Sequence, residues 1–338
     1  MKRIAVIGAG KMGISHCSIL GANRKVEIVG IADTTPLIQD VLTKHTPFPV
    51  FSDYRNLIDQ QKPDAAVVSV PTLYHDKIVS DLLDRRIHVF VEKPFVLKAI
   101  QGARLISKAD AFHLINQVGY HCRFIATFQE AHRIISSGLL GELFQFSGSV
   151  IGNVFNQHRK GNWRSDPVQG GCILDYSSHL IDLVHFLIDD IEKIHHAELL
   201  SLYGKDVEDV MTAIVSSKKG IRGTLYVNWS DPTIRKMNIS MTVMGSKGKL
   251  IVDGTELKLY LRSKPDDTRY SSGWNLRSID KITSSPEFYL RGEEYSLQMD
   301  HFIEHLYSGG KGQTNTFLSA IKTDYVIDSL RQYKIHAV

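Results

Sequence analysis

Cysteine is scarce in this sequence, and long apolar runs are missing. Among 338 residues there are three cysteines, Cys17, Cys122 and Cys172, with no Cys-x-x-Cys spacing. An odd number without that spacing argues against a disulfide framework and a structural zinc site, and it fits a reducing compartment, so we expect a cytoplasmic protein. No stretch approaches the ~18 consecutive apolar residues of a membrane span. The sequence therefore predicts neither a disulfide-rich secreted domain nor a membrane protein.

A large excess of charge of one sign is also missing. The 40 Lys and Arg residues against 36 Asp and Glu leave a net charge of +4, and the two signs are interspersed along the chain. A nucleic-acid-binding protein would instead gather its basic residues on one stripe. We therefore expect no nucleic-acid partner and no membrane partner.

The composition is typical of a folded enzyme. Hydrophobic residues make up 43% of the chain and charged residues 22%, which excludes a disordered, collagen-like or coiled-coil protein. At ~150 residues per domain, the length predicts about two domains.

The first 120 residues alternate short apolar runs with helical patterns. Five runs rich in β-branched residues are predicted strands, at residues 4–7, 26–31, 65–70, 88–91 and 114–118. Strands that are apolar throughout are buried on both faces, which indicates a parallel sheet covered by helices. Residues 1–120 are therefore predicted to form a doubly wound α/β domain of the Rossmann type.

The rest of the chain, residues 121–338, shows a different pattern and is predicted to be a second α/β domain. Helices are expected at 125–136, 174–187 and 317–333, and residues 262–294 are the segment most expected to be mobile. Residues 224–229 and 237–243 alternate polar and apolar side chains, as strands of an antiparallel sheet do when one face packs on a core. The polar face is either solvated or a wet interface between subunits.

A glycine motif follows the first predicted strand. Gly8, Gly10 and Gly13 form GxGxxG, with Lys11 and Met12 between the last two. The first glycine permits a tight turn, the second lets backbone N–H groups approach a pyrophosphate, and the third permits close helix packing. These residues are the predicted cofactor-binding turn.

The second predicted strand ends in an acidic residue that favours NAD. Asp33 lies 20 residues after Gly13, where a carboxylate accepts hydrogen bonds from an adenosine ribose. The carboxylate would repel a 2′-phosphate, and Thr34 follows it with no neighbouring arginine, so NAD is predicted rather than NADP.

Two further motifs carry groups suited to proton transfer. Lys93 follows the strand at 88–91, and ligands of doubly wound sheets bind at the carboxyl ends of strands. Asp175 and His179 are four residues apart, which places them on one face if the segment is an α-helix. Without other signals, this spacing is more often an incidental pair on a helix that begins with an acidic residue.

Together these motifs resemble the glucose-fructose oxidoreductase, inositol dehydrogenase and MocA (Gfo/Idh/MocA) family. The matching features are GAGKMG at 8–13, Asp33, PTLYH at 71–75, EKP at 92–94, GYHCRF at 119–124, NWR at 162–164, GGCILDYSSH at 170–179 and GSKG at 245–248. They follow in order over nearly the whole chain, and EKP together with GG-x3-D-x3-H is specific. The resemblance implies a Rossmann domain followed by an α/β domain with a large open, mainly antiparallel sheet.

The resemblance also implies roles for single residues. Lys93 would hydrogen-bond the reacting hydroxyl or carbonyl near the nicotinamide, His179 would transfer the proton, and Asp175 would assist His179 or bind substrate. Histidine titrates near neutral pH, and an ammonium group stabilises developing alkoxide charge, so the chemistry agrees. The further cofactor-binding residues would be Thr72, His75, Glu92 and Lys93 itself. The substrate pocket would be lined by Lys93, His121, Arg123, Trp163, Arg164, Asp175 and His179.

Some features are left open at this level. Cys172 and the run 176–178 depart from the usual family pattern at positions that could reshape the pocket. The basic stretch 157–164 is either a solvated loop or a site for an anionic group of the substrate. No metal is expected on Cys172, Asp175 and His179, because hydride transfer needs none.

The predicted function is an NAD-dependent dehydrogenase acting on a secondary alcohol or ketone of a sugar or cyclitol. The alternative within this class is a nucleotide-linked or amino sugar as substrate. A non-catalytic sensor of NAD(P) is disfavoured, because a sensor has no need of the proton-transfer group His179. By the resemblance, we also expect a homodimer or homotetramer formed through the open face of the sheet.

Overall fold

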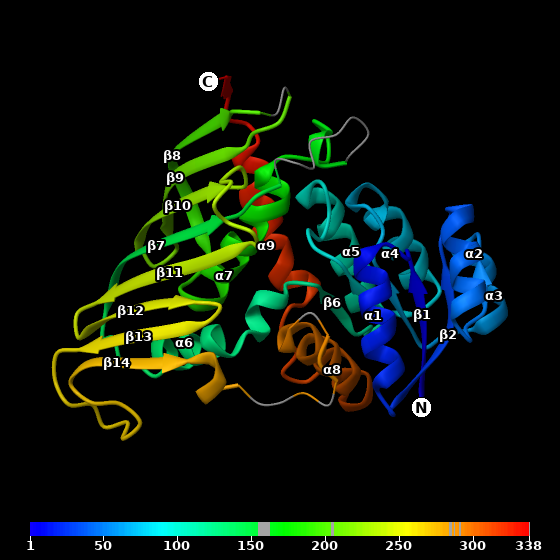
Figure 1. Cartoon of the computed structure of the whole chain (residues 1–338), viewed down its shortest axis with the longest axis horizontal. Coiled ribbons are helices and arrows are strands. Elements are labelled where there is room, and N and C mark those ends of the chain that lie inside the picture. Colours follow the sequence, from blue (N-terminus) through cyan, green and yellow to red (C-terminus); the bar gives the residue numbers. More distant parts are fainter. Residues whose placement is uncertain (155–162, 204–205, 284–285, 287, 291, 338) are drawn as a thin grey trace. The chain divides into compact units, whose positions relative to one another are not determined.

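The computed structural model describes residues 1–154, 163–203, 206–283, 286, 288–290 and 292–337 (Figure 1). The chain divides into two compact units: Met1–His121 with Ser285–Ile321, and Cys122–Ser284 with Lys322–Val338. The second unit begins close to the division that the sequence predicts. The chain then returns to the first unit with residues 285–321, which the predicted boundaries assign to the second domain.

The first unit contains a six-stranded sheet in the order β3-β2-β1-β4-β5-β6. All neighbouring strands are parallel. The strands are β1 (Lys2–Ile7), β2 (Val26–Ala32), β3 (Val50–Phe51), β4 (Ala65–Val68), β5 (His88–Val91) and β6 (Asn116–Val118). The predicted doubly wound parallel sheet is confirmed, and the short strand β3 is an addition to it.

Helices cover both faces of this sheet. They are α1 (Lys11–Ala22), α2 (Pro36–His45), α3 (Tyr54–Gln61), α4 (His75–Asp84), α5 (Ala99–Ala111) and α8 (Glu293–Ser308), with a 3₁₀ turn, η1 (Thr72–Tyr74), before α4. Side chains alternate along each strand, so β1 gives Ile4 and Val6 to a core shared with α1, α2 and α8. Ala5 and Ile7 join the opposite core with α3, α4 and α5. This two-sided burial explains why the strands are apolar throughout.

The second unit contains a nine-stranded sheet in the order β14-β13-β12-β11-β7-β10-β9-β8-β15. The strands are β7 (Leu143–Ile151), β8 (Ile191–Ser201), β9 (Val210–Ser217), β10 (Arg222–Asn228), β11 (Asn238–Gly245), β12 (Gly248–Asp253), β13 (Glu256–Leu261), β14 (Gly273–Ser278) and β15 (Ile335–Ala337). Most neighbours are antiparallel, while β10 with β7 and β15 with β8 are parallel. The predicted large, mainly antiparallel sheet is confirmed.

One face of this sheet packs against helices and the other is open (Figure 1). In β10 buried and exposed residues alternate strictly, as the sequence predicts. Helices α6 (Ala126–Ser136) and α7 (Ser178–Leu187) cover the buried face, and α9 (Phe317–Leu330) is the last helix of the chain. A Cβ on Gly148 of β7 would lie 2.6 Å from Leu180 Cδ1, so this glycine lets α7 approach the sheet closely.

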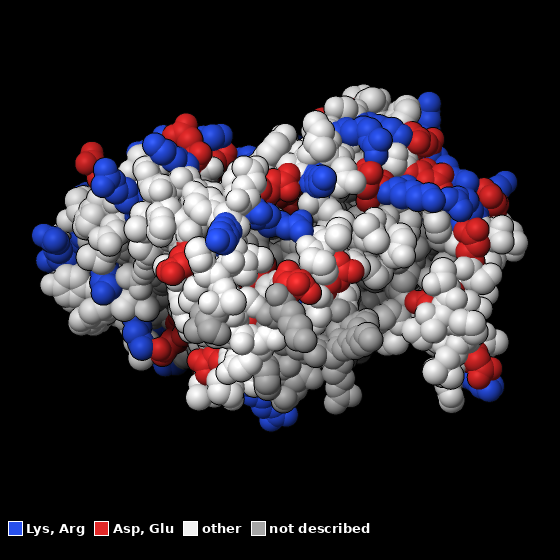
Figure 2. Space-filling model, turned by 90° about the horizontal axis from the view of Figure 1, so that it is seen from above, with Lys and Arg blue, Asp and Glu red and all other residues white. Residues whose placement is uncertain are grey.

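The surface carries both signs of charge. On the face that Figure 2 shows, acidic side chains lie beside basic ones. In the first unit, for example, Arg85 pairs with Asp81, and Lys108 pairs with Asp84. No helix among the described residues has both the length and the apolar composition needed to cross a bilayer.

Candidate cofactor and catalytic sites

The GxGxxG turn joins β1 to α1, and two of its glycines are required by the protein itself. Gly8 has φ +90°, a conformation that side chains other than glycine rarely adopt. A Cβ on Gly13 would lie 1.9 Å from the carbonyl oxygen of Gly8. Ser69 donates a hydrogen bond to the same carbonyl at 2.8 Å, and the turn is therefore held between α1 and the end of β4.

Gly10 differs from the other two glycines because the protein does not require it. Its φ of −67° and ψ of −173° suit any residue, and a Cβ there would meet no atom within 4 Å. Gly10 is the N-cap of α1, has no capping side chain, and no acidic residue lies in the first helical turn. This open space at an uncapped helix N-terminus fits the pyrophosphate of a dinucleotide, which backbone N–H groups would bind.

Asp33 fixes the turn while it closes β2. Its Oδ2 accepts a hydrogen bond from the Ala9 N–H at 2.8 Å, and its Oδ1 accepts one from the Thr35 N–H at 2.8 Å. Each carboxylate oxygen has a further lone pair for a ribose hydroxyl. Near it, Lys11 and Thr34 are exposed and Met12 is half-buried. These positions suit the cofactor contacts that the sequence predicts for them.

The loop after β5 holds Glu92 and Lys93. His16 of α1 is fully buried and its Nε2 lies 2.7 Å from Glu92 Oε1. Glu92 Oε2 accepts the backbone N–H of Lys93 at 3.2 Å. Burial alone would raise the pKa of Glu92, but the hydrogen bond from His16 and the nearby charges of Lys93 and His121 hold that pKa below its usual range. Glu92 is therefore a fixed carboxylate beside Lys93.

His75, at the start of α4, is fully buried. Its Nδ1 lies 3.1 Å from the Pro94 carbonyl oxygen, and its Nε2 lies 3.0 Å from the Val70 carbonyl oxygen. Burial lowers the pKa of His75. Nδ1 thus contacts the backbone just after Lys93, and Nε2 contacts the loop after β4. The predicted cofactor contact of His75 stays a prediction. Thr72, in η1, is half-buried.

The motif at 170–179 has a local structure that the sequence did not predict. Residues Ile173–Ser177 form a π-helical turn, and the α-helix α7 begins only at Ser178. The expected helix at 174–187 is present, but it begins with this π turn and is α-helical only from Ser178. Both side chains are buried. A π turn inside a helix is rare and is frequent at functional sites.

A buried acid from elsewhere in the second unit supports this turn. Glu208 Oε1 accepts the Ile173 N–H at 2.8 Å. A Cβ on Gly171, which has φ +91°, would lie 2.2 Å from the same oxygen. Burial raises the pKa of Glu208 to about 7. The second glycine of the pair is thus required by its conformation and by Glu208.

Arg164 and Trp163 lie at the start of the segment that leads into the motif. Arg164 Nε donates a hydrogen bond to Asp175 Oδ2 at 2.9 Å, and the guanidinium carbon lies 4.4 Å from the centre of the Trp163 ring. Trp163 is 38% exposed. The remainder of the predicted basic stretch, residues 157–162, lies outside the described residues.

His179 lies in the first turn of α7. Its Nδ1 is 3.8 Å from Cys122 Sγ, and the ring is almost fully buried. Cys172, where the family pattern departs, is also buried, and burial raises the pKa of its thiol well above the usual range. The hydroxyl groups of Ser177 and Ser178 donate to backbone carbonyls within the turn.

Two predicted substrate-binding residues have other partners in the structure. The guanidinium of Arg123 donates two hydrogen bonds to Asp182, from Nε at 2.8 Å and from Nη2 at 2.6 Å. Arg123 is 8% exposed and Asp182 is fully buried, so this geometry gives no support to a substrate contact by Arg123. His121 stacks on Tyr295 of α8, with ring centres 4.5 Å apart.

The sequence analysis missed His16, Asp182 and Glu208. His16 could have been noticed in the sequence, because it is a histidine on the apolar side of α1, three residues after Gly13. Asp182 is likewise an acid in an otherwise apolar stretch of α7. Glu208 lies between β8 and β9, far along the chain from the residues it supports, and no pattern in the sequence connects it to them.

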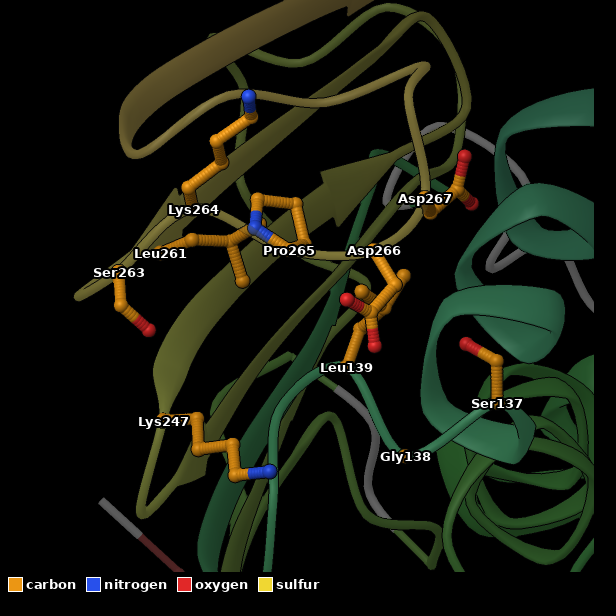
Figure 3. Close-up of a pocket in the computed structure, with 10 residues that line it drawn as sticks. All are labelled: Ser137, Gly138, Leu139, Lys247, Leu261, Ser263, Lys264, Pro265, Asp266 and Asp267. Carbon is orange, nitrogen blue, oxygen red and sulfur yellow. The ribbon is translucent and has the colours of Figure 1, made fainter.

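The second unit contains a cavity of about 400 Å³ (Figure 3). Lys247 of the GSKG motif lines it, but none of the predicted site residues does. Lys247 and Lys264 come from its two sides, and the side chain of Lys264 points away from Asp266 (Figure 3). The lining mixes lysines and aspartates and indicates no ligand of one charge.

Comparisons with known proteins define the class of this chain. A family model described as an oxidoreductase family with an NAD-binding Rossmann fold matches residues 2–120, and a model of the GFO/IDH/MocA C-terminal domain matches residues 128–251. Fold, glycine turn and family model together define an NAD-binding oxidoreductase. The chain belongs to the Gfo/Idh/MocA family. The predicted family, the fold class and NAD as cofactor are confirmed, and the class of nicotinamide-dependent dehydrogenase is confirmed at the level of the family.

Individual relatives are distant. An uncharacterised oxidoreductase of Schizosaccharomyces pombe is 34% identical over 134 residues, which are 39% of this chain and 36% of that protein. An NAD(+)-dependent scyllo-inositol 2-dehydrogenase of Bacillus subtilis is 24% identical over 319 residues, 91% of this chain and 86% of its own length. A levoglucosan dehydrogenase crystallised with NADH superposes with a TM-score of 0.86 at 17% identity, covering 98% of this chain and 96% of the other. At that identity the structural likeness shows the fold alone.

Proposed function

We propose that this protein is an NAD-dependent dehydrogenase that interconverts a secondary alcohol and a ketone on a sugar or cyclitol. The observation that carries the proposal is that the NAD-binding turn with Asp33 and the motif residues Lys93, Asp175 and His179 occur in one chain. Relatives named for inositols support the substrate class. Bound NAD would supply a nicotinamide that accepts the hydride.

The residues of the chain would supply binding and proton transfer. Lys93 would donate a hydrogen bond to the reacting oxygen and stabilise its developing negative charge. His179 would accept the hydroxyl proton at Nε2, because its Nδ1 faces Cys122 Sγ and would hold the other ring proton. Asp175, held by Arg164, would bind a neighbouring substrate hydroxyl or assist His179.

The test is a screen of the purified protein with NAD. Cyclitols, aldoses and nucleotide sugars are offered separately, and NADH absorbance is followed. Lys93→Met is expected to lower turnover by on the order of 10³-fold, because the positive charge at the reacting oxygen is lost, while NADH binding is kept. Lys98→Met, five residues further along and exposed, is the matched control. Turnover that is unchanged in Lys93→Met removes Lys93 from the mechanism.

A nucleotide-linked or amino sugar is the second candidate substrate. Support comes from the basic stretch 157–164 and from a WlbA dehydrogenase of Bordetella pertussis, crystallised with NADH and UDP-GlcNAcA, which superposes with a TM-score of 0.79 at 20% identity. Activity confined to the nucleotide sugars of the screen would favour this candidate. NADH binding with no turnover of any compound would instead favour a sensor.

We further propose a cytoplasmic homodimer or homotetramer formed through the open face of the nine-stranded sheet. The three cysteines are free thiols, which suits a reducing compartment.

The open face of the sheet carries large exposed side chains: Tyr226 (37% exposed), Tyr260 (38%), Trp274 (60%) and Leu276 (64%). Tyr260 of β13 lies opposite Trp274 of β14, and Lys258 lies opposite Leu276 on the same face. Light scattering on Trp274→Glu should show smaller particles than the wild type; an unchanged mass contradicts the proposed interface.

A further inference from the structure

His16 is a polar side chain inside the apolar core of the first unit. Its ring is fully buried and meets Phe90 edge to face, with ring centres 5.1 Å apart. Its Nδ1 has no hydrogen-bond partner among the described residues. A buried polar atom without a partner costs stability. The imidazole is thus a poor choice for packing alone, and its hydrogen bond to Glu92 is the feature that distinguishes it from an apolar residue.

The carboxylate of Glu92 is held from several sides. His16 Nε2 donates to Oε1, since a carboxylate can only accept, and the Lys93 N–H donates to Oε2. The chain after β6 closes the remaining side, because a Cβ on Gly119 would lie 3.0 Å from Oε2. Glu92 therefore has little freedom to move, and it bonds directly to the backbone of the next residue.

This pair connects two segments that are distant in the sequence. His16 belongs to α1, whose N-terminus carries the predicted phosphate-binding turn, and it lies three residues after Gly13. Glu92 directly follows β5 and precedes Lys93. The hydrogen bond of 2.7 Å between them thus ties the helix at the dinucleotide turn to the loop of the proposed catalytic lysine.

We propose that His16 is a positioning residue, which fixes the backbone of Lys93 through the carboxylate of Glu92. The role of His16 rests on the function proposed for Lys93. An apolar residue at position 16 would leave the Glu92 carboxylate without its side-chain donor, and the carboxylate would then turn or protonate and release the Lys93 N–H. A shift of that loop by about 1 Å can cost roughly 100-fold in rate when it displaces a reacting group.

The experiment compares His16→Met with His16→Gln. The two side chains have nearly the same length and volume, but only glutamine has an N–H that can reach Glu92. Ser15→Ala is the control, because Ser15 is buried on the same helix and, among the described residues, its hydroxyl bonds only to the Lys11 carbonyl. Selective ¹⁵N-lysine labelling, with Lys93 assigned through Lys93→Arg, gives the hydrogen-exchange rate of the Lys93 amide. The same variants are assayed for NADH affinity and for kcat.

In His16→Met we expect the Lys93 amide to exchange about tenfold faster, because local opening of the loop costs less. We also expect kcat to fall at least tenfold and the Kd for NADH to change less than twofold. His16→Gln and Ser15→Ala should match the wild type in all three. Unchanged exchange in His16→Met overturns the proposal. Equal acceleration in the glutamine and methionine variants also overturns it, because packing of the imidazole would then be what matters.

A replacement variant and the exchange measurement keep the experiment decisive if His16→Met does not fold or the wild type shows no turnover. If His16→Met does not fold, His16→Asn replaces it, because the amide of asparagine is one methylene too short to reach Glu92. If the wild type turns over no compound of the screen, the proposed function fails, whereas the exchange rate of the Lys93 amide still decides whether His16 fixes that backbone.

Discussion

Arg164 donates a hydrogen bond from Nε to Oδ2 of Asp175, and the two groups are 2.9 Å apart. Asp175 is 5% exposed, so this hydrogen bond supplies positive charge to a buried carboxylate. The family resemblance places both residues in the substrate pocket without linking them. The structure instead links them, which gives Arg164 an effect on every substrate that uses Asp175.

The first prediction follows from this link. Arg164→Met should lower kcat/KM by roughly 100-fold for neutral and charged substrates alike, because Asp175 loses the group that orients it. The affinity for NADH should be kept. Kinetics with a polyol and a nucleotide sugar test the prediction. A loss confined to the charged substrate would instead show that Arg164 binds the anionic group itself.

The second prediction separates a glycine that the ligand requires from one that the fold requires. Gly10→Ala should leave the thermal unfolding temperature unchanged and weaken NADH binding at least tenfold, because its Cβ meets no protein atom but would enter the phosphate site. Gly13→Ala should destabilise the protein by about 1–3 kcal/mol, since its Cβ would clash with the Gly8 backbone. Thermal unfolding and NADH titration of both variants give the comparison. Wild-type affinity in Gly10→Ala would contradict the assigned phosphate position.

The third prediction concerns the buried pair of Arg123 and Asp182. Arg123→Met leaves the fully buried Asp182 carboxylate without its partner, which should destabilise the protein by about 3–5 kcal/mol. The double variant Arg123→Met with Asp182→Leu should recover most of that loss, because no unpaired charge remains. Urea unfolding of the wild type, Arg123→Met, Asp182→Leu and the double variant measures the coupling. Additive losses would show that the two side chains contribute separately.

The fourth prediction is a pH dependence caused by Glu208. Burial raises the pKa of Glu208 from 4.5 to about 7, so the folded protein holds this proton more tightly than the unfolded chain. Between pH 4.5 and about 7, ionisation of Glu208 therefore lowers the free energy of unfolding as the pH rises, and the effect is complete above pH 7. As the pH rises through this range, the free energy of unfolding of Glu208→Gln should increase relative to that of the wild type by on the order of 3 kcal/mol. Parallel stability curves of the two proteins would contradict the raised pKa.

Much of the first unit could be predicted from residue patterns. Strands buried on both faces leave apolar runs such as residues 65–68, and the glycines around β1 meet backbone constraints that hold at short range. Asp33 was found because its distance from Gly13 is set by one helix and one strand. In each case the signal and its cause lie close together in the chain.

The second unit was predicted less completely. In β8 the pairing with β9 shifts register between Ile191 and Lys193 and again between Ile194 and His196, which breaks the two-residue alternation that reveals a strand. Strand β14, within the segment 262–294 that was expected to be mobile, is six residues long at the sheet edge. Strand β13 alternates as clearly as β10 and could have been found.

The sequence by itself determined the NAD-binding turn, because a short glycine motif encodes it. Its resemblance to the Gfo/Idh/MocA family implied the class of enzyme and singled out Lys93, Asp175 and His179. The tertiary structure decided which groups hold these residues in place. Glu92 receives its hydrogen bond from His16, 76 residues earlier, and Asp182 binds Arg123, 59 residues earlier. Sequence distance does not limit such partners, because a charged group removed from water needs a hydrogen-bond donor or acceptor, and the fold can supply one from any part of the chain.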